Sequence, residues 1–136
     1  MESKNFLGEV GQKALIARDG KVLMCRGVGE SGWDFPGGRL QAGEFPAAGL
    51  QRELKEELGI DDIEISTPLF TFSFVPKSGI PRFFVIYRCM LKNPEAGFVL
   101  QEEEIAEVRW VGQGEVDSLE TPPAWKDALK AYFGVR

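Results

Sequence analysis

The sequence predicts an α+β protein in which a mixed β-sheet lies between α-helices, an α/β/α sandwich. β-rich and helical segments follow one another in the order β-β-loop-α-β-β-β-α, which favours a sheet covered by helices. The 136 residues are 43% hydrophobic and 27% charged, as is typical of one globular domain. We therefore expect residues 1–136 to form a single domain.

The first two strands are predicted on either side of a tight turn. Residues 10–17 and 21–25 are largely apolar and flank Asp19-Gly20, a dipeptide that favours a two-residue hairpin turn. A glycine-rich loop, 27–33, follows and leads into a partly extended segment before the first helix.

A second, longer hairpin is predicted in the middle of the chain. Residues 63–75 and 82–91 are rich in β-branched and aromatic residues, and the segment between them, 76–81, has two prolines and a glycine. A polar loop at 92–104 then precedes another short strand, 107–111.

Two helices complete the predicted fold. The first should begin near Phe45 or Pro46, since proline suits a first helical turn, and should end at Gly59 as a C-cap glycine. The second should cover residues 124–133, with Thr121 as its N-cap.

Composition excludes several classes of function. The net charge of −5 argues against a sequence-independent grip on duplex nucleic acid. Without histidine, the chain lacks Ser-His-Asp and Cys-His catalysis and the usual nitrogen ligand for zinc. No apolar run is long enough to span a bilayer, and no secretory signal is visible, so cytoplasmic residence is expected. Homodimer formation is left open.

The first helix carries a concentrated acidic face. Glu53, Glu56 and Glu57 are related by i, i+3 and i+4 spacing, so their carboxylates are expected to converge within a few ångströms. Like charges at that distance repel one another, and a Mg²⁺ or Mn²⁺ ion between them would turn the repulsion into ligation. The simpler alternative is a solvated helix face with an Arg52–Glu56 pair.

A longer pattern favours the metal site over that alternative. Gly38 is followed after five residues by Glu44, and after seven more by the segment Arg-Glu-Leu-x-Glu-Glu-x-Gly-Ile at 52–60. Many fixed positions rarely agree by accident. This pattern resembles the signature of the Nudix (MutT-type) hydrolases at every defined position. The resemblance implies hydrolysis of a diphosphate linkage in a nucleotide, with Mg²⁺ or Mn²⁺ as cofactor.

The resemblance also implies a role for each residue of the motif. Glu53 and Glu57 would be the chief metal ligands, Glu56 would bind directly or through water, and the Gly37 carbonyl would complete the shell. Arg52 would orient the acids, and Glu44 would brace the loop. The general base is either Glu53 or one of Glu102, Glu103 and Glu104; we prefer Glu53 as the base and Glu103 as an additional metal ligand. The alternative for the later glutamates is an ordinary charged loop.

Substrate contacts are predicted around the same cleft. Gly38 would bring its backbone close to a phosphate, and Arg26 would reach a phosphate or simply cap the loop. Phe35, with Trp33, would stack on a base, and Phe74 and Tyr87, with Phe83, would line the cleft. Aromatic residues on strands are, however, often part of a core.

The short chain favours a (deoxy)nucleoside triphosphate as substrate, cleaved to a monophosphate and pyrophosphate. ADP-ribose, a nucleotide sugar and a dinucleoside polyphosphate are alternatives, and the identity of the base stays open. A Nudix module that binds a nucleotide without catalysis and a calcium-binding structural domain are the rivals from other classes. The first usually loses the motif's acids, all of which are present here, and the helical spacing of the acids does not fit an EF-hand loop.

Overall fold

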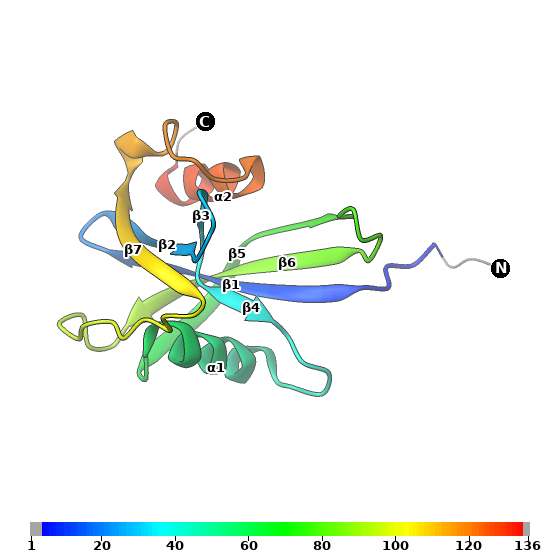
Figure 1. The fold of residues 1–136 in the computed structure, drawn as a ribbon, viewed down its shortest axis with the longest axis horizontal. Coiled ribbons are helices and arrows are strands. Elements are labelled where there is room, and N and C mark those ends of the chain that lie inside the picture. Colours follow the sequence, from blue (N-terminus) through cyan, green and yellow to red (C-terminus); the bar gives the residue numbers. More distant parts are fainter. Residues whose placement is uncertain (1–3, 135–136) are drawn as a thin grey trace.

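The computed structural model describes residues 4–134, in which two α-helices lie on opposite sides of a seven-stranded sheet (Figure 1). The helices are α1 (Pro46–Leu58) and α2 (Pro123–Phe133), and a 3₁₀ turn at Gln113–Glu115 follows the last strand. The predicted order of elements is confirmed, and the partly extended segment before α1 supplies two short additional strands. The strands are β1 (Glu9–Arg18), β2 (Lys21–Gly27), β3 (Trp33–Asp34), β4 (Gly37–Arg39), β5 (Ile63–Phe74), β6 (Arg82–Leu91) and β7 (Ile105–Gly112).

The sheet is mixed, as predicted. β1 runs parallel to β6, whereas β1–β2, β2–β7 and β5–β6 are antiparallel pairs. The β1–β2 turn places Asp19 and Gly20 at φ values of 51° and 76°, which is the positive-φ pair that a two-residue hairpin turn requires. β4 pairs with β1 and sets Gly37 and Gly38 opposite Lys13 and Gln12. We call β4 the glycine strand because two of its three residues are glycine, and it borders the face that α1 covers.

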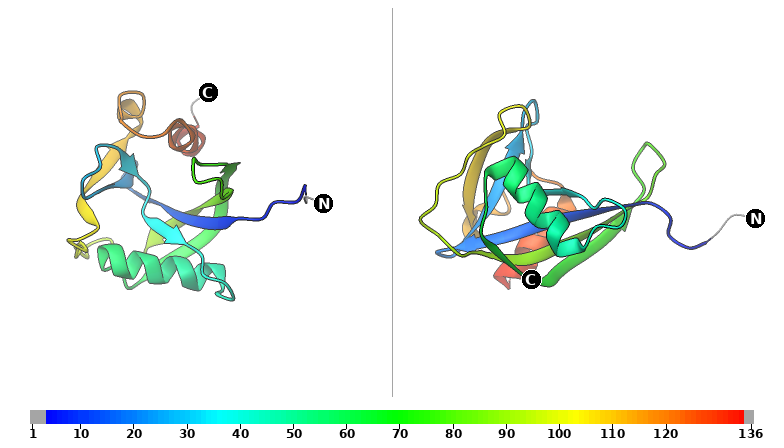
Figure 2. Two further views of the ribbon diagram at one scale, coloured as in Figure 1. Left: turned by 45° about the vertical axis from the view of Figure 1, so that its right-hand side comes forward. Right: turned by 90° about the horizontal axis from the view of Figure 1, so that it is seen from below.

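Each face of the sheet packs against one helix. Successive side chains of a strand point to opposite faces, so Ala14 and Ile16 of β1 join the core beneath α1, while Leu15 joins the core beneath α2. Figure 2 shows the same arrangement from two further directions. The sheet between two helical layers is the α/β/α sandwich expected from the sequence.

The helix ends agree with the sequence at α1 but not at the start of α2. α1 runs from Pro46 to Leu58, and Gly59 is its C-cap, whose φ of 68° allows its N–H to bond to carbonyls of the last turn. The predicted N-cap role of Thr121 is wrong. The N-cap position is Pro122, without a side-chain cap, and the Thr121 hydroxyl donates instead to the Trp33 carbonyl at 2.7 Å. Neither helix of the described chain is long and apolar enough to cross a membrane.

Candidate metal and nucleotide site

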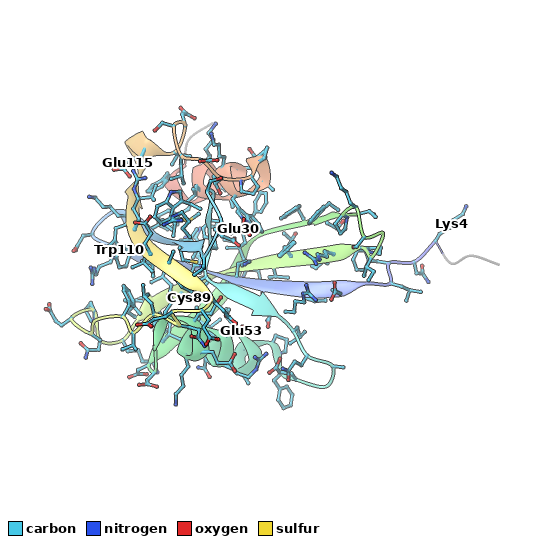
Figure 3. All side chains as sticks on the ribbon, viewed as in Figure 1. Lys4, Glu30, Glu53, Cys89, Trp110 and Glu115 are labelled. Carbon is cyan, nitrogen blue, oxygen red and sulfur yellow. The ribbon has the colours of Figure 1, made fainter. Side chains whose placement is uncertain are left out.

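The leucines of α1 determine where its acids point. Leu50, Leu54 and Leu58 are fully buried against the sheet. The acids lie on an adjoining stripe of the helix, and Figure 3 shows Glu53 on the side of α1 that faces β4. The Glu53 side chain is only 19% exposed, whereas Glu56 is 59% exposed. Glu53 is therefore largely covered, whereas Glu56 lies mostly in solvent.

Arg52 connects three of the predicted site residues. Its Nε and Nη2 donate to the two oxygens of Glu44 at 2.8 and 3.2 Å, and its Nη1 donates to Glu53 Oε1 at 3.0 Å and lies 3.5 Å from Glu56. A two-point contact of this kind fixes the direction of both groups. The hydrogen bonds from Arg52, and then that from the Gln41 backbone, lower the pKa of Glu44, so Glu44 stays ionised.

Two glycines leave room for these carboxylates. A Cβ added to Gly38 would lie 2.5 and 2.7 Å from the oxygens of Glu53, and one added to Gly49 would lie 2.6 Å from Glu44 Oε1. Real Cβ atoms do not approach other atoms so closely. Glycine is therefore required at both positions for the acids to lie as they do.

Glu57 is a partly buried acid of the site. It accepts a hydrogen bond from the Gly37 N–H at 2.9 Å. Burial raises its pKa from 4.5 to about 7, against the opposing effects of the Gly37 hydrogen bond and of Lys13, and Glu53 and Glu104 raise it further. A glutamate that is costly to ionise beside other acids is a group whose charge a cation would stabilise.

The donor chemistry of the site fits Mg²⁺ or Mn²⁺, because every candidate ligand is an oxygen. The expected convergence of the acids is nevertheless not seen, since between residues 4 and 134 no three acidic or thiol side chains are gathered closely enough to form a finished metal cage. Arg52 holds Glu53, Gly37 holds Glu57, and Glu56 points largely to solvent. These side chains would have to reorient around a cation.

The later glutamate run contributes a different residue from the one predicted. Glu104 lines a cavity together with Glu57 and is close enough to raise the Glu57 pKa. Glu103 is exposed and does not line that cavity; its backbone N–H faces the Gln101 side chain at 3.4 Å. The structure therefore places Glu104, not Glu103, beside the acids of α1. The run occupies a loop, so the sequence offered no periodicity from which to choose among its members.

Two cavities adjoin this site, and Lys13 and Asp34 line both. We call the first, of about 390 Å³, the acidic cavity, because Glu57, Glu104 and Glu30 lie in its wall. We call the second, of about 500 Å³, the aromatic cavity. Four aromatic side chains line it: Phe72, Phe74, Phe84 and Trp125. Lys13 Nζ and Asp34 Oδ2 form an ion pair at 3.1 Å between the two cavities.

The predicted substrate residues fall into two groups. Gly38 and Phe74 line the aromatic cavity, in agreement with the placement expected for them. Phe35 lies in the wall of the acidic cavity, but it is fully buried and its ring packs edge to face with that of Trp125. The ring therefore offers no surface for stacking on a base, and that prediction is wrong. Trp33 lines the same cavity and is only partly buried.

Tyr87 and Arg26 are also placed differently from the expectation. Tyr87 packs on the core beneath α1, on the opposite face of the sheet from the aromatic cavity, because it is an odd number of residues from Phe84 on β6. Phe83 also lies outside the aromatic cavity and packs against Phe6. Arg26 donates to Glu107 at 2.8 Å and to the Glu30 carbonyl at 2.8 Å, so it acts as the loop cap that the sequence left as the alternative.

Several residues that line the cavities were not predicted from the sequence, among them Lys13, Asp34, Phe72, Phe84 and Trp125. Phe70, Phe72 and Phe74 alternate along β5, and this period of two placed them on one face, but the sequence did not show which face. No local sequence pattern marked Lys13 as a site residue, because its neighbours Asp34 and Glu57 come from distant parts of the chain.

Comparison with known proteins agrees with this architecture. The solved structure of the MutT protein from Methanosarcina mazei Go1 superimposes with a TM-score of 0.81 at 21% identity and covers 97% of both chains. An RNA pyrophosphohydrolase of Halorhodospira halophila is 39% identical over 67 residues, which are 48% of this chain and 36% of that protein. The match thus spans little more than a third of that relative's length.

Two further comparisons extend over most of the sequence. The nucleoside triphosphatase NudI of Enterobacter sp. is 27% identical over 124 residues, which are 78% of this chain and 83% of that protein. The family model of the NUDIX domain matches residues 11–133. The chain therefore belongs to the Nudix hydrolase family.

Proposed function

We propose that this chain is a divalent-metal-dependent hydrolase that cleaves a diphosphate linkage in a small nucleotide. The favoured substrate is a nucleoside triphosphate, which would give a monophosphate and pyrophosphate. The observation that carries the proposal is the partly buried Glu57 carboxylate, which the Gly37 N–H holds at 2.9 Å on a glutamate-rich helix face that borders β4. Burial raises its pKa to about 7. The relatives named above as a pyrophosphohydrolase and a nucleoside triphosphatase support the reaction class.

Oxygen atoms of Glu53, Glu56, Glu57 and Gly37 would hold the cation. When bound, Mg²⁺ or Mn²⁺ acidifies a water molecule and neutralises charge on the phosphates. Arg52 would keep the glutamates in place, since it already binds Glu44, Glu53 and Glu56.

Glu53 is our candidate for the general base. Arg52 occupies its Oε1 at 3.0 Å, and Oε2 would take the proton of the attacking water. The glycine at position 38 would let the substrate's phosphates approach the backbone beside this carboxylate. Transfer of the proton to a positioned carboxylate contributes about 10²–10⁴-fold to such reactions.

The aromatic cavity would hold the nucleoside. Its four aromatic side chains supply flat apolar surface, and Gly38 lines it next to Glu53, so a nucleotide could place its base among the rings and its phosphates at the acids. The net charge of −5 favours a small metal-bound nucleotide over a long polyanion.

The test is a substrate panel with Mg²⁺ or Mn²⁺, comprising (d)NTPs, ADP-ribose, nucleotide sugars, dinucleoside polyphosphates and RNA with a 5′-triphosphate. We expect metal-dependent release of a monophosphate product, and Glu53→Gln should reduce kcat by about 10²–10⁴-fold while the fold persists. Glu64→Gln, the same change at an exposed residue on β5, is the matched control. A folded wild-type protein that hydrolyses no member of the panel, or that binds nucleotides without turnover, would contradict the proposal.

A further inference from the structure

Two segments that are far apart in the sequence form one end of the molecule. Residues 4–8 precede β1, and residues 73–83 surround the turn between β5 and β6; Figure 1 shows both at the same end of the sheet. The Glu9 N–H donates to the Pro81 carbonyl at 2.9 Å and fastens one segment to the other. We call the surface that these two segments share the apolar end.

Exposed apolar side chains are concentrated on this surface. Ten large apolar side chains are exposed among residues 4–134, and six of them lie at the apolar end: Phe6, Leu7, Phe74, Val75, Ile80 and Phe83. Phe6 and Phe83 also pack edge to face, with ring centroids 6.2 Å apart. A single exposed apolar residue is ordinary on a protein surface, but a gathered set of them is typical of a surface that contacts a partner or a membrane.

The charge of the apolar end is opposite in sign to that of the chain as a whole. Its two segments contain three of the 16 Lys and Arg residues and none of the 21 Asp and Glu residues; the cations are Lys4, Lys77 and Arg82. Arg82 lies 3.5 Å from Glu9, whereas neither lysine pairs with an acid of residues 4–134. An anionic surface would therefore attract this end and repel the acidic remainder of the molecule.

The groove between the two segments is shallow. It has a volume of about 640 Å³, and Leu7, Phe74 and Val75 lie in its wall. These three side chains are 73%, 41% and 65% exposed, so the groove encloses little. A peptide gains most of its binding energy where its side chains fill desolvated pockets, whereas a membrane interface needs only projecting apolar groups. The shape therefore favours a lipid surface over a peptide.

A second copy of the chain fits this surface less well. In a two-fold dimer the same patch faces itself, so Lys4 and Lys77 of one copy would approach the same lysines of the other. The apolar end has no acid to neutralise them. Like charges brought together at an interface weaken it, while the phosphates of an anionic lipid surface would pair with the same lysines.

We propose that the apolar end docks this protein on an anionic lipid surface. Leu7, Val75 and Ile80 enter the interfacial layer, and Lys4 and Lys77 contact the lipid phosphates. Each lysine near such a surface strengthens binding about fivefold, and burial of the apolar side chains adds to it. The docking is reversible, because a few side chains bind far more weakly than a spanning helix. It does not depend on the proposed hydrolysis.

The test is sedimentation of the protein with vesicles of phosphatidylcholine alone and with vesicles that also contain phosphatidylglycerol, in about a 2:1 ratio. We expect the protein to sediment with the anionic vesicles at low salt and to be released by about 0.5 M salt, which screens the lysines. Val75→Asp should weaken this binding by about tenfold or more. Val28→Asp is the same change at an exposed valine in the loop between β2 and β3, and it should bind as the wild type does.

A second pair of variants tests the charges. Lys77→Gln should weaken binding to the anionic vesicles about fivefold, whereas Lys21→Gln, at an exposed lysine of β2, should leave it unchanged. The docking would be overturned by wild-type protein that stays in solution with anionic vesicles, by equal binding to neutral vesicles, or by full binding of folded Val75→Asp. A wild-type dimer in ultracentrifugation that Val75→Asp dissociates would overturn it as well, because the apolar end would then join two copies. The wild-type measurements need no variant, and none of them requires a nucleotide, so the hydrolase activity is tested separately.

Discussion

Gly38→Ala tests whether the Glu53 carboxylate must lie where the structure places it. The added Cβ would be 2.5 Å from Glu53 Oε2, about 0.9 Å closer than the 3.4 Å at which ordinary contacts begin. The carboxylate is the free end of a flexible side chain, so it would move by about that distance rather than disrupt the strand. A displacement of about 1 Å at a reacting group can reduce turnover by about 100-fold.

The fold should tolerate this change because Gly38 does not have a left-handed backbone conformation. We therefore expect Gly38→Ala to unfold at nearly the wild-type temperature, while kcat with Mg²⁺ falls about 100-fold. Gly114→Ala is the control, since a Cβ there meets nothing within 4 Å and the backbone again needs no positive φ. Wild-type kcat in a folded Gly38→Ala variant would refute the assignment of Glu53 as the group that acts on the substrate.

Three further predictions concern neighbouring residues. The pKa of Glu57 is about 7 in the folded protein, against the usual 4.5 expected in the unfolded chain. Between these two values the folded protein holds a proton that the unfolded chain releases, so the metal-free protein should lose stability as the pH rises from about 4.5 to about 7. Thermal unfolding measured across this range should show the slope in wild type and lose most of it in Glu57→Gln, and equal slopes would contradict the burial of this acid. Arg52→Lys should reduce kcat by about 10–100-fold, because lysine keeps the charge but not the fork that holds Glu44 and Glu53; unchanged kinetics would show that the two-point contact is dispensable. Glu104→Gln should weaken Mn²⁺ binding in calorimetry while Glu103→Gln leaves it unchanged, and the reverse pattern would show that the loop rearranges around the cation.

Local signals predicted most of the fold correctly. Asp19-Gly20, the proline that begins α1 and Gly59 each act on the backbone within a few residues, so their consequences can be derived from neighbours in sequence. Thr121 failed for the opposite reason. Its hydroxyl found a partner at Trp33, 88 positions away, and no local rule anticipates that competition.

The candidate site also has a part that local sequence patterns predict and a part that depends on distant residues. The acids of α1 were predictable because helical spacing places them on one face, yet their convergence was overestimated, since Arg52 and the Gly37 N–H each hold one of them. The residues that line the two cavities were harder to predict. Whether Phe35 stacks on a ligand or fills a core depends on the position of Trp125, which only the packing of α2 against the sheet determines.

The most direct test of the central claim is a ³¹P NMR time course of a nucleoside triphosphate with the wild-type protein, recorded with Mg²⁺ and again with excess chelator. If the helix acids hold a cation that supports cleavage of a diphosphate linkage, the nucleotide signals should give way to a monophosphate and pyrophosphate, and only while Mg²⁺ is free. Cleavage that continues unchanged under chelator would contradict the account, as would a spectrum that stays constant with Mg²⁺ across all the triphosphates tried.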